Sequence, residues 1–183
     1  MTEVLNALLE RSSEPRLCAP APDEASLEKA FAAAARAPDH ALLRPWRYLV
    51  IEGEGLDRLG DLFASTASPD TPPEKLDKLR NMPRRAPMMI VGIASHKAHP
   101  KVPEVEQTMS AAAGMAYLLL ALQSAGFGAM WRTGDVAYDE RVQQGLGLAE
   151  NEFITGFLYV GSVCQPKPEV PRPAHGDFVS RWP

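Results

Sequence analysis

Two short polar segments hold the side chains of this sequence that are best suited to binding an anion. Arg11, Ser12, Ser13 and Arg16 lie close together near the N-terminus, and Trp131-Arg132-Thr133 lies far along the chain. Guanidinium and hydroxyl donors that converge from two loops can hold a phosphate without a glycine-rich loop. Each segment alone also fits an ordinary polar loop. The sequence therefore predicts a phosphate site if the fold brings the two segments together.

Motifs for other common chemistries are absent from the sequence. No Gly-x-x-x-x-Gly-Lys-Ser/Thr or Gly-x-Ser-x-Gly is present, and neither Gly53-Glu-Gly55 nor Gly145-Leu-Gly147 has the third glycine of a dinucleotide fingerprint. His96 and His99 lie in a loop without an obvious third ligand, where solvated histidines are commoner than metal ligands. The sequence therefore does not indicate a P-loop, a Rossmann site, a nucleophile-elbow hydrolase or a metal site.

The elements that must position the two polar segments follow from hydrophobic periodicity and turn residues. Helices are expected over 2–10, from Asp23 to Pro38, and over 56–64, 73–81, 104–125 and 139–146, and strands over 46–51, 88–94, 127–131 and 153–160. Strands interleaved with helices predict a layered α/β or α+β domain with four or five strands. In this order, the first polar segment follows the first helix and the second leaves the third strand.

The segment from Thr108 to Trp131 contains no charged residue and is long enough to cross a bilayer. It is rich in alanine, contains Gln123 and is broken by Gly126 and Gly128. These features favour a helix buried all round in a protein core over a membrane span.

Composition and charge restrict the class of protein. The chain has 183 residues, of which 45% are hydrophobic and 23% charged, as in an ordinary globular domain. Its net charge of −4 argues against nucleic acid or an anionic membrane as the main partner, so a small substrate is expected. Cys18 and Cys164 lie far apart without a Cys-x-x-Cys, so we expect no disulfide framework and a reducing cytoplasm. Glu3, Glu10 and Arg11 interrupt the apolar core that an export signal needs.

Residues 166–183 form a Pro-rich tail to the domain that the rest of the chain predicts. Its prolines favour an extended spacer, yet the tail ends in Phe178, Val179 and Trp182. Apolar residues at the end of an extended arm usually have a partner surface. We therefore expect a C-terminal arm that reaches a second subunit, with a frayed terminus as the alternative.

The order of the motifs resembles the nitroreductase family of FMN-dependent oxidoreductases, and within it the short YdjA-type NAD(P)H nitroreductases. The resemblance runs over nearly the whole chain. The motifs that carry it are Arg11-Ser12-Ser13 with Arg16, Arg36-Ala-Pro-Asp-His40, Arg44-Pro-Trp46, Glu52-Gly-Glu-Gly55, Arg85-Ala-Pro87, Lys101-Val-Pro103, Gln107-x-Met-Ser110, Gly126-Phe-Gly128, Trp131-Arg-Thr-Gly134 and Gly156-Phe-Leu-Tyr-x-Gly161.

The resemblance implies an α+β nitroreductase fold, with a mixed sheet of four or five strands flanked by helices, assembled as an intertwined homodimer with FMN at the interface. It implies three groups of cofactor-binding residues. The FMN phosphate would be held by Arg11, Ser12 and Ser13, with Arg16 near the flavin ring; Trp131, Arg132 and Thr133 would complete the site in the same subunit, and Arg36, Pro38 and His40 would come from the partner subunit.

The implied activity is the transfer of hydride from NAD(P)H to a small electrophile, such as a nitro compound, a quinone or an activated alkene, in a ping-pong cycle. The cofactor carries the chemistry in such enzymes and the protein supplies position and electrostatics, so no catalytic side chain is expected. Two alternatives remain open: a flavin-binding module without turnover, and a structural dimer without cofactor.

Overall fold

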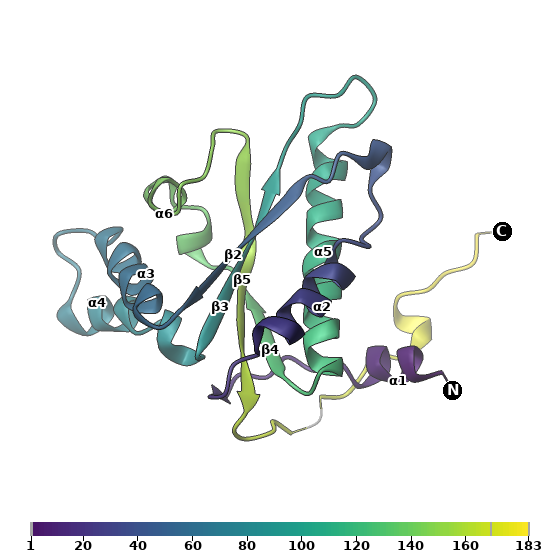
Figure 1. Cartoon of the computed structure of the whole chain (residues 1–183), viewed down its shortest axis with the longest axis horizontal. Helices are drawn as coiled ribbons and strands as arrows, with labels where there is room; N and C mark the ends of the chain where they lie inside the picture. Colours follow the sequence, from purple (N-terminus) through teal and green to yellow (C-terminus); the bar gives the residue numbers. More distant parts are fainter. Residues whose placement is uncertain (1, 169, 183) are drawn as a thin grey trace.

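A five-stranded sheet lies between two layers of helices (Figure 1). The computed structural model describes residues 2–168 and 170–182. The strands are β1 (Leu17–Cys18), β2 (Trp46–Glu52), β3 (Met88–Ser95), β4 (Gly128–Arg132) and β5 (Glu152–Val163). The α-helices are α1 (Glu3–Glu10), α2 (Glu24–Ala34), α3 (Glu54–Ser65), α4 (Pro73–Arg80), α5 (Glu104–Ser124) and α6 (Glu140–Gly145), and short 3-10 turns cover His40–Leu42, Pro83–Arg85, Asp135–Ala137 and His175–Asp177.

These bounds follow the predicted ranges closely because most elements carry a clear periodicity and clear end signals. The side chain of Asp23 accepts a hydrogen bond from the Ser26 amide and caps α2, as predicted. Gly126 follows α5 with φ at 89°, a conformation that glycine adopts without strain, as its predicted role at the helix end requires. Strand β1 was not predicted, because two residues are too short to show a pattern.

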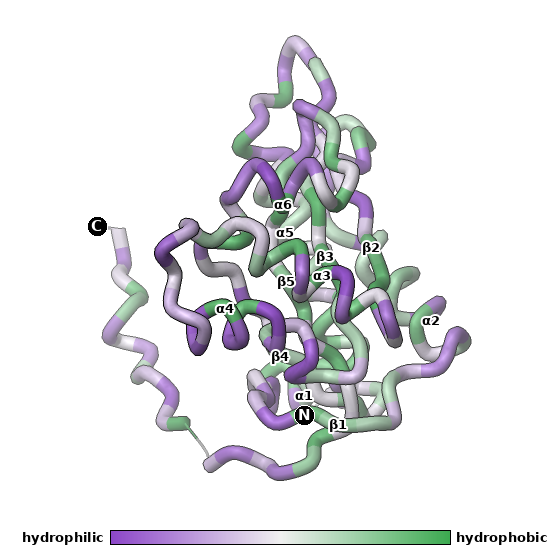
Figure 2. Tube along the Cα trace, turned by 90° about the vertical axis from the view of Figure 1, so that its left-hand side faces the viewer, coloured by the Kyte–Doolittle hydropathy of each residue, from purple (hydrophilic) through white to green (hydrophobic). Residues whose placement is uncertain are grey.

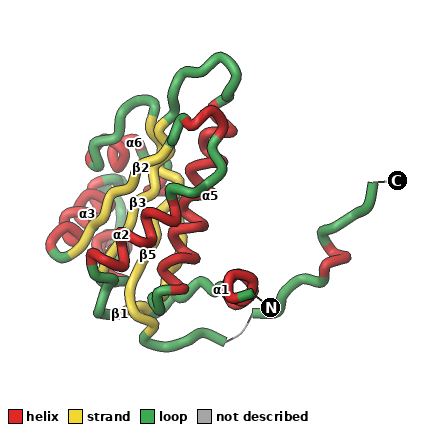
Figure 3. Tube along the Cα trace, turned by 45° about the vertical axis from the view of Figure 1, so that its right-hand side comes forward, coloured by secondary structure: helices red, strands yellow, loops and turns green. Residues whose placement is uncertain are grey.

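Strand β3 forms the centre of the core and is buried on both faces. Its side chains alternate between the layers: Val91 lies in one cluster with Phe63 of α3, and Ile90 lies in the other with Leu118 of α5. Helices α3 and α6 therefore cover one face of the sheet, and α2 and α5 cover the other (Figure 3). Each fully buried side chain of this size contributes about 1.5 to 3 kcal/mol to folding.

The sheet order is β2-β3-β5, and β5 also pairs with β4 over Phe157–Gly161 and with β1 at Ser162 and Val163. Every strand pair among the described residues is antiparallel, so the expectation of a mixed sheet is wrong for this part of the chain. The reason lies in the connections. Helices α3 and α4 bring the chain back to the end of the sheet at which β2 finishes, whereas a parallel pair needs a crossover to the opposite end.

Helix α5 is a core helix, but it is buried on one side only. By length and composition it is the one described helix that could cross a membrane. Met115 and Leu118 are fully buried against the sheet, whereas Val105, Met109 and Tyr117 are 58%, 65% and 40% exposed. The expectation of a helix buried all round is therefore wrong, and the reason is that helices and strands of the same chain cover only its inner side. We call Val105, Met109, Ala116 and Tyr117 the outer stripe of α5.

Cys18 and Cys164 form a disulfide across 146 residues, which corrects the expectation that they stay unpaired. The pairing of β1 with the end of β5 sets Cys18 opposite Ser162 and brings the two cysteine Cα atoms to 5.8 Å. Spacing in the sequence could not show this, because the sheet register creates it. Because the two cysteines are paired, they no longer support the expectation of a reducing compartment.

After β5 the chain leaves the layered body (Figure 1; Figure 2). The guanidinium of Arg172 donates a hydrogen bond to the Arg11 carbonyl at 2.8 Å, and the segment beyond it extends into solvent. Phe178 is 68% exposed and Trp182 is 96% exposed. The structure thus presents a tail whose aromatic side chains have little contact with their own subunit.

Candidate functional site

The predicted phosphate-binding residues lie in a loop that joins α1 to β1, which we call the 10–16 loop. Two elements hold its backbone. The Ser12 amide donates to Oε1 of Gln123 on α5 at 3.3 Å, and the Glu14 amide donates to the Ala129 carbonyl of β4 at 3.0 Å. Between side chains of the loop, the Arg11 guanidinium donates a hydrogen bond to the Ser13 hydroxyl at 3.3 Å. A guanidinium and a hydroxyl are thus already side by side in this loop.

The second predicted segment begins in β4, whose last residues are Trp131 and Arg132. The Trp131 indole N–H donates to the Thr155 carbonyl at 3.1 Å. Gly156 lets the indole approach the backbone of β5, because a Cβ at this glycine would collide with Trp131. The Arg132 guanidinium lies 5.9 Å from the centre of the Tyr159 ring, a cation–π distance.

The fold brings these two segments together. Glu14 from the 10–16 loop and Arg132 from β4 line one small cavity, together with Arg85 and Tyr159. Burial raises the pKa of the Tyr159 hydroxyl, while the guanidinium groups of Arg85 and Arg132 act in the opposite direction. One carboxylate oxygen of Glu14 is buried there without a hydrogen-bond partner among the described residues. Two guanidinium groups thus face one carboxylate in this cavity.

Arg85 was not predicted as a site residue, although its motif Arg85-Ala-Pro87 was noted in the sequence. Nothing in the local pattern shows that the 3-10 turn Pro83–Arg85 brings this guanidinium beside Arg132. Arg16 and Thr133 are exposed residues next to the site. Their exposure leaves both side chains accessible to a molecule bound at the surface.

The third predicted group is not brought to this site within the described chain. Ser110 of α5 donates to the Pro38 carbonyl at 2.5 Å, and Nδ1 of His40 lies 2.8 Å from Oε2 of Glu106. Both contacts lie toward the start of α5, whereas Gln123 contacts the 10–16 loop at its end. The span from Ser110 to Gln123 corresponds to roughly 20 Å of helix. Pro38 and His40 are therefore remote from the loop in the same chain.

Arg36 occupies a different surface again. It is an exposed residue at the end of α2, and it lines an apolar groove with Val4, Leu8, Tyr117 and Leu120. The groove, formed by α1, α2 and α5, has a volume of about 420 Å³. The Arg36 guanidinium thus lies at the edge of an exposed apolar surface.

The segment after His40 is strained. Ala41, Leu42 and Arg44 have φ angles of 62°, 54° and 48°, in the left-handed region that residues other than glycine rarely adopt. Local bonds hold this conformation, since the Arg44 amide donates to the Asp39 carboxylate at 2.7 Å and the Lys97 ammonium donates to the Leu43 carbonyl at 2.5 Å. Such outliers persist only where the surroundings fix them, and they are frequent at functional sites.

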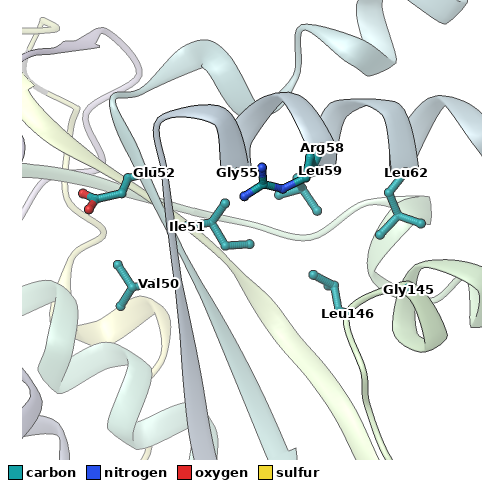
Figure 4. A pocket seen from close by; sticks show the side chains of 9 residues that line it. All are labelled: Val50, Ile51, Glu52, Gly55, Arg58, Leu59, Leu62, Gly145 and Leu146. Carbon is teal, nitrogen blue, oxygen red and sulfur yellow. The ribbon is translucent and has the colours of Figure 1, made fainter.

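A further groove lies beside β2, on the face of the sheet that α3 covers (Figure 4). It has a volume of about 420 Å³ and is mostly apolar, with Glu52 and Arg58 as its charged residues. Its lining includes Val50, Ile51 and Leu146. Among the described residues, strand β2 pairs only with β3, so its other edge is open along this groove. Across the described residues 2–168 and 170–182, no group of three or more His, Cys, Asp or Glu side chains is placed to hold a metal ion.

Comparison with known proteins decides the family. A family model described as "Nitroreductase family" matches residues 10–162, most of the chain, and includes both polar segments of the site. The chain belongs to the nitroreductase family. Among curated relatives, "Putative NAD(P)H nitroreductase YdjA" of Escherichia coli (strain K12) is 38% identical over 161 residues, which cover 87% of this chain and 88% of the relative.

Solved structures of the nitroreductase family share the fold. A nitroreductase-like family protein from Bacillus cereus superposes with a TM-score of 0.87 at 22% identity, covering 99% of this chain and 96% of the other. A protein from Desulfovibrio desulfuricans described as a "putative nitroreductase in complex with FMN" gives a TM-score of 0.79 at 22% identity and covers 100% of this chain and 98% of the other. The predicted α+β nitroreductase fold is confirmed.

Proposed function

We propose that this chain is an FMN-dependent oxidoreductase that transfers hydride from NAD(P)H to a small electrophile, of the class of nitro compounds, quinones and activated alkenes. The observation that carries the proposal is the meeting of the 10–16 loop with the end of β4, within a chain of the nitroreductase family. The relative named as an NAD(P)H nitroreductase and the FMN-bound neighbour support the choice of both cofactors.

The residues present fit the FMN phosphate. Arg11 and Arg132 supply guanidinium groups, and Ser12 and Ser13 supply hydroxyls, which together match a phosphate with several acceptor oxygens. When bound, FMN supplies the hydride chemistry. Arg16, at the exposed end of the loop, is our candidate for a cation beside the flavin ring, where it would favour negative charge on the ring. Trp131 and Thr133 would border the cofactor from the side of β4.

We further propose that the active unit is a homodimer in which Arg36, Pro38 and His40 of one subunit complete the site of the other. Pro38 and His40 lie far from the 10–16 loop of their own chain, so they can serve a cofactor there only if a second copy brings them. The outer stripe of α5 and the apolar groove beside Arg36 offer the hydrophobic surface that such an interface needs.

The first experiment measures flavin and turnover on the purified protein. We expect visible flavin absorbance that is released on denaturation, and oxidation of NADH or NADPH that depends on a nitroaromatic or a quinone. Alternating-substrate kinetics should give the parallel lines of a ping-pong cycle. Flavin without turnover would identify a binding module instead, and a colourless protein that takes up no FMN would identify a structural dimer.

The second experiment tests the phosphate contacts. Arg11→Ala and Arg132→Ala should each weaken FMN binding roughly tenfold or more, because a charge-assisted hydrogen bond contributes about 1.5 to 3 kcal/mol. Fluorescence titration of FMN measures the change. Arg80→Ala is the matched control, since Arg80 lies on α4 and pairs with Asp61 at the surface. An Arg11 variant with the affinity of the control would remove Arg11 from the site.

A further inference from the structure

Gln123 holds the 10–16 loop at two points. Its Oε1 accepts the Ser12 amide N–H at 3.3 Å, and its Nε2 donates to the Glu10 carbonyl at 3.3 Å. A primary amide carries a donor and an acceptor on one planar group, so a single side chain can satisfy an N–H and a carbonyl two residues apart. Gln123 is half-buried in the last turn of α5, so a rigid helix carries the group that contacts the loop.

These two hydrogen bonds hold the residues on either side of Arg11. With the backbone fixed at Glu10 and at Ser12, the residue between them has little freedom to turn, and its own carbonyl accepts the Arg172 guanidinium. The Arg11 side chain is thereby directed toward the Ser13 hydroxyl, 3.3 Å away. Holding donors in their bound arrangement before a ligand arrives increases affinity, because less ordering remains to be done on binding.

A second glutamine of α5, Gln107, also holds the backbone of a neighbouring loop through its side-chain amide. Its Oε1 accepts the Lys97 amide at 2.8 Å, and its Nε2 donates to the carbonyls of Lys97 and Val102 at 2.9 and 3.3 Å. Gln107 is 1% exposed and holds the loop after β3. Near each end of α5, therefore, a glutamine fixes a neighbouring loop, and of these two loops the one at Gln123 carries the arginine and serines of the proposed phosphate site.

We propose that Gln123 is a positioning residue for the cofactor phosphate, acting through the backbone of Glu10 and Ser12 on the side chains of Arg11 and Ser13. This role rests on the proposed function. In this role, Gln123 arranges the phosphate donors and makes no contact with the reacting atoms. Both hydrogen bonds join groups of this chain alone, so a measurement other than turnover can test them.

The test compares Gln123→Leu, which removes both bonds, with Gln123→Glu, which keeps the acceptor for Ser12. Gln144→Leu, at an exposed position of α6, is the matched control. In FMN-free protein, amide hydrogen exchange at Ser12 should become faster in Gln123→Leu and stay near wild type in Gln123→Glu. The Kd for FMN should rise roughly tenfold in Gln123→Leu and less in Gln123→Glu, with no change in the control.

Two results would overturn the proposal: wild-type Ser12 exchange in Gln123→Leu, or faster exchange with an unchanged Kd. If Gln123→Leu does not fold, Gln123→Ala and Gln123→Glu give the same comparison. A wild-type protein that binds no FMN would overturn the proposed function and with it this role of Gln123, whereas a change confined to the Gln123 variants leaves the proposed function intact. The two failures are thus distinguishable.

Discussion

The indole of Trp131 rests against the backbone of β5 because residue 156 has no side chain. Gly156 also has a φ of 155°, which side-chain-bearing residues rarely adopt. The Trp131 N–H then reaches the Thr155 carbonyl, next to the position where Arg132 pairs with Phe157. A single glycine on β5 therefore determines how a proposed cofactor residue of β4 packs.

Gly156→Ala should destabilise the protein by about 1 to 3 kcal/mol, because the new methyl group meets the indole and the backbone angle is strained. Denaturant unfolding measures the loss, and tryptophan fluorescence should report the displaced indole. FMN affinity should fall with it. Gln144→Ala, at an exposed position of α6, is the control and should leave all three unchanged. Wild-type stability in Gly156→Ala would contradict the packing described for Trp131.

The sequence allowed candidate phosphate donors to be named because arginine and serine are chemically distinctive and closely spaced, and their role stays a prediction. The roles of Gly156 and Arg85 escaped prediction, because a backbone angle and an approach between distant segments leave no mark in the local pattern. The disulfide escaped for the same reason, since Cys18 and Cys164 meet only through the register of β1 on β5. Residue chemistry was thus easier to predict than residue position.

Among the elements, β2 and β5 are joined across β3 by an ion pair. Arg47 contacts Glu152 through two bonds, Nε to Oε1 at 2.7 Å and Nη2 to Oε2 at 2.6 Å. Glu152 also accepts the Ala149 amide at 3.0 Å, and Arg47 also donates to the Gly147 carbonyl at 3.3 Å. The carboxylate side chain is only 9% exposed, so the pair is largely withdrawn from water.

The hydrogen bonds from Arg47 hold the pKa of Glu152 at about 2, below the ordinary value of 4.5. A depressed folded-state pKa stabilises the protein above pH 4.5, and this contribution is lost as the pH falls toward 2. We expect wild type to lose about 2 to 3 kcal/mol more than Glu152→Gln over this interval. Urea unfolding of both proteins from pH 6 to pH 2 measures the difference.

Glu54→Gln is the control for this measurement, because Glu54 is 92% exposed and pairs with Arg58 only at 3.6 Å. Its unfolding should follow the wild-type pH dependence. Parallel curves for wild type and Glu152→Gln would show that Glu152 titrates alike in the folded and unfolded states.

Helix and strand positions were predictable because periodicity and capping residues act locally. Strand direction was not, because the antiparallel return of β3 depends on how α3 and α4 pack. The one-sided burial of α5 was also hidden: its composition is apolar all round, and only the tertiary structure shows that the outer stripe has no cover in the described chain. This open apolar face is the surface that the proposed homodimer would cover.

For the whole molecule, the outer stripe gives the sharpest test of the homodimer. Met109→Glu should weaken self-association strongly, because it places a charge in the proposed apolar interface. Analytical ultracentrifugation at micromolar concentration measures the change, and FMN affinity should fall in parallel. Gln144→Glu on α6 adds the same charge elsewhere and should change neither. A wild-type monomer that is fully loaded with FMN would contradict the shared site.

We propose that the tail crosses to the partner and lies along the open edge of its β2. That edge is the more accessible one, since the 10–16 loop already bonds to β4 on the other side of the sheet. The apolar groove beside β2 can receive an aromatic side chain such as Phe178 or Trp182 (Figure 4). An added strand would also satisfy backbone groups that an open edge leaves unpaired.

Deleting residues 166–183 should lower dimer affinity and weaken FMN binding, because the site depends on how the subunits meet. Trp182→Ala should give part of the effect, since burying one large side chain contributes roughly 2 to 3 kcal/mol. Sedimentation and FMN titration measure both quantities. Lys167→Ala, in the spacer, is the control. A truncated protein with wild-type association and FMN affinity would identify the tail as an ordinary terminus.

The hydrogen bond from Arg172 to the Arg11 carbonyl joins the root of this tail to the proposed phosphate loop. Tail docking and phosphate binding are then linked equilibria, and linkage is reciprocal. Whatever factor a docked tail adds to the affinity for FMN, bound FMN must add to the affinity between subunits. Loss of cofactor and loss of partner would therefore promote each other, so that the fraction of dissociated subunits would rise as FMN is depleted.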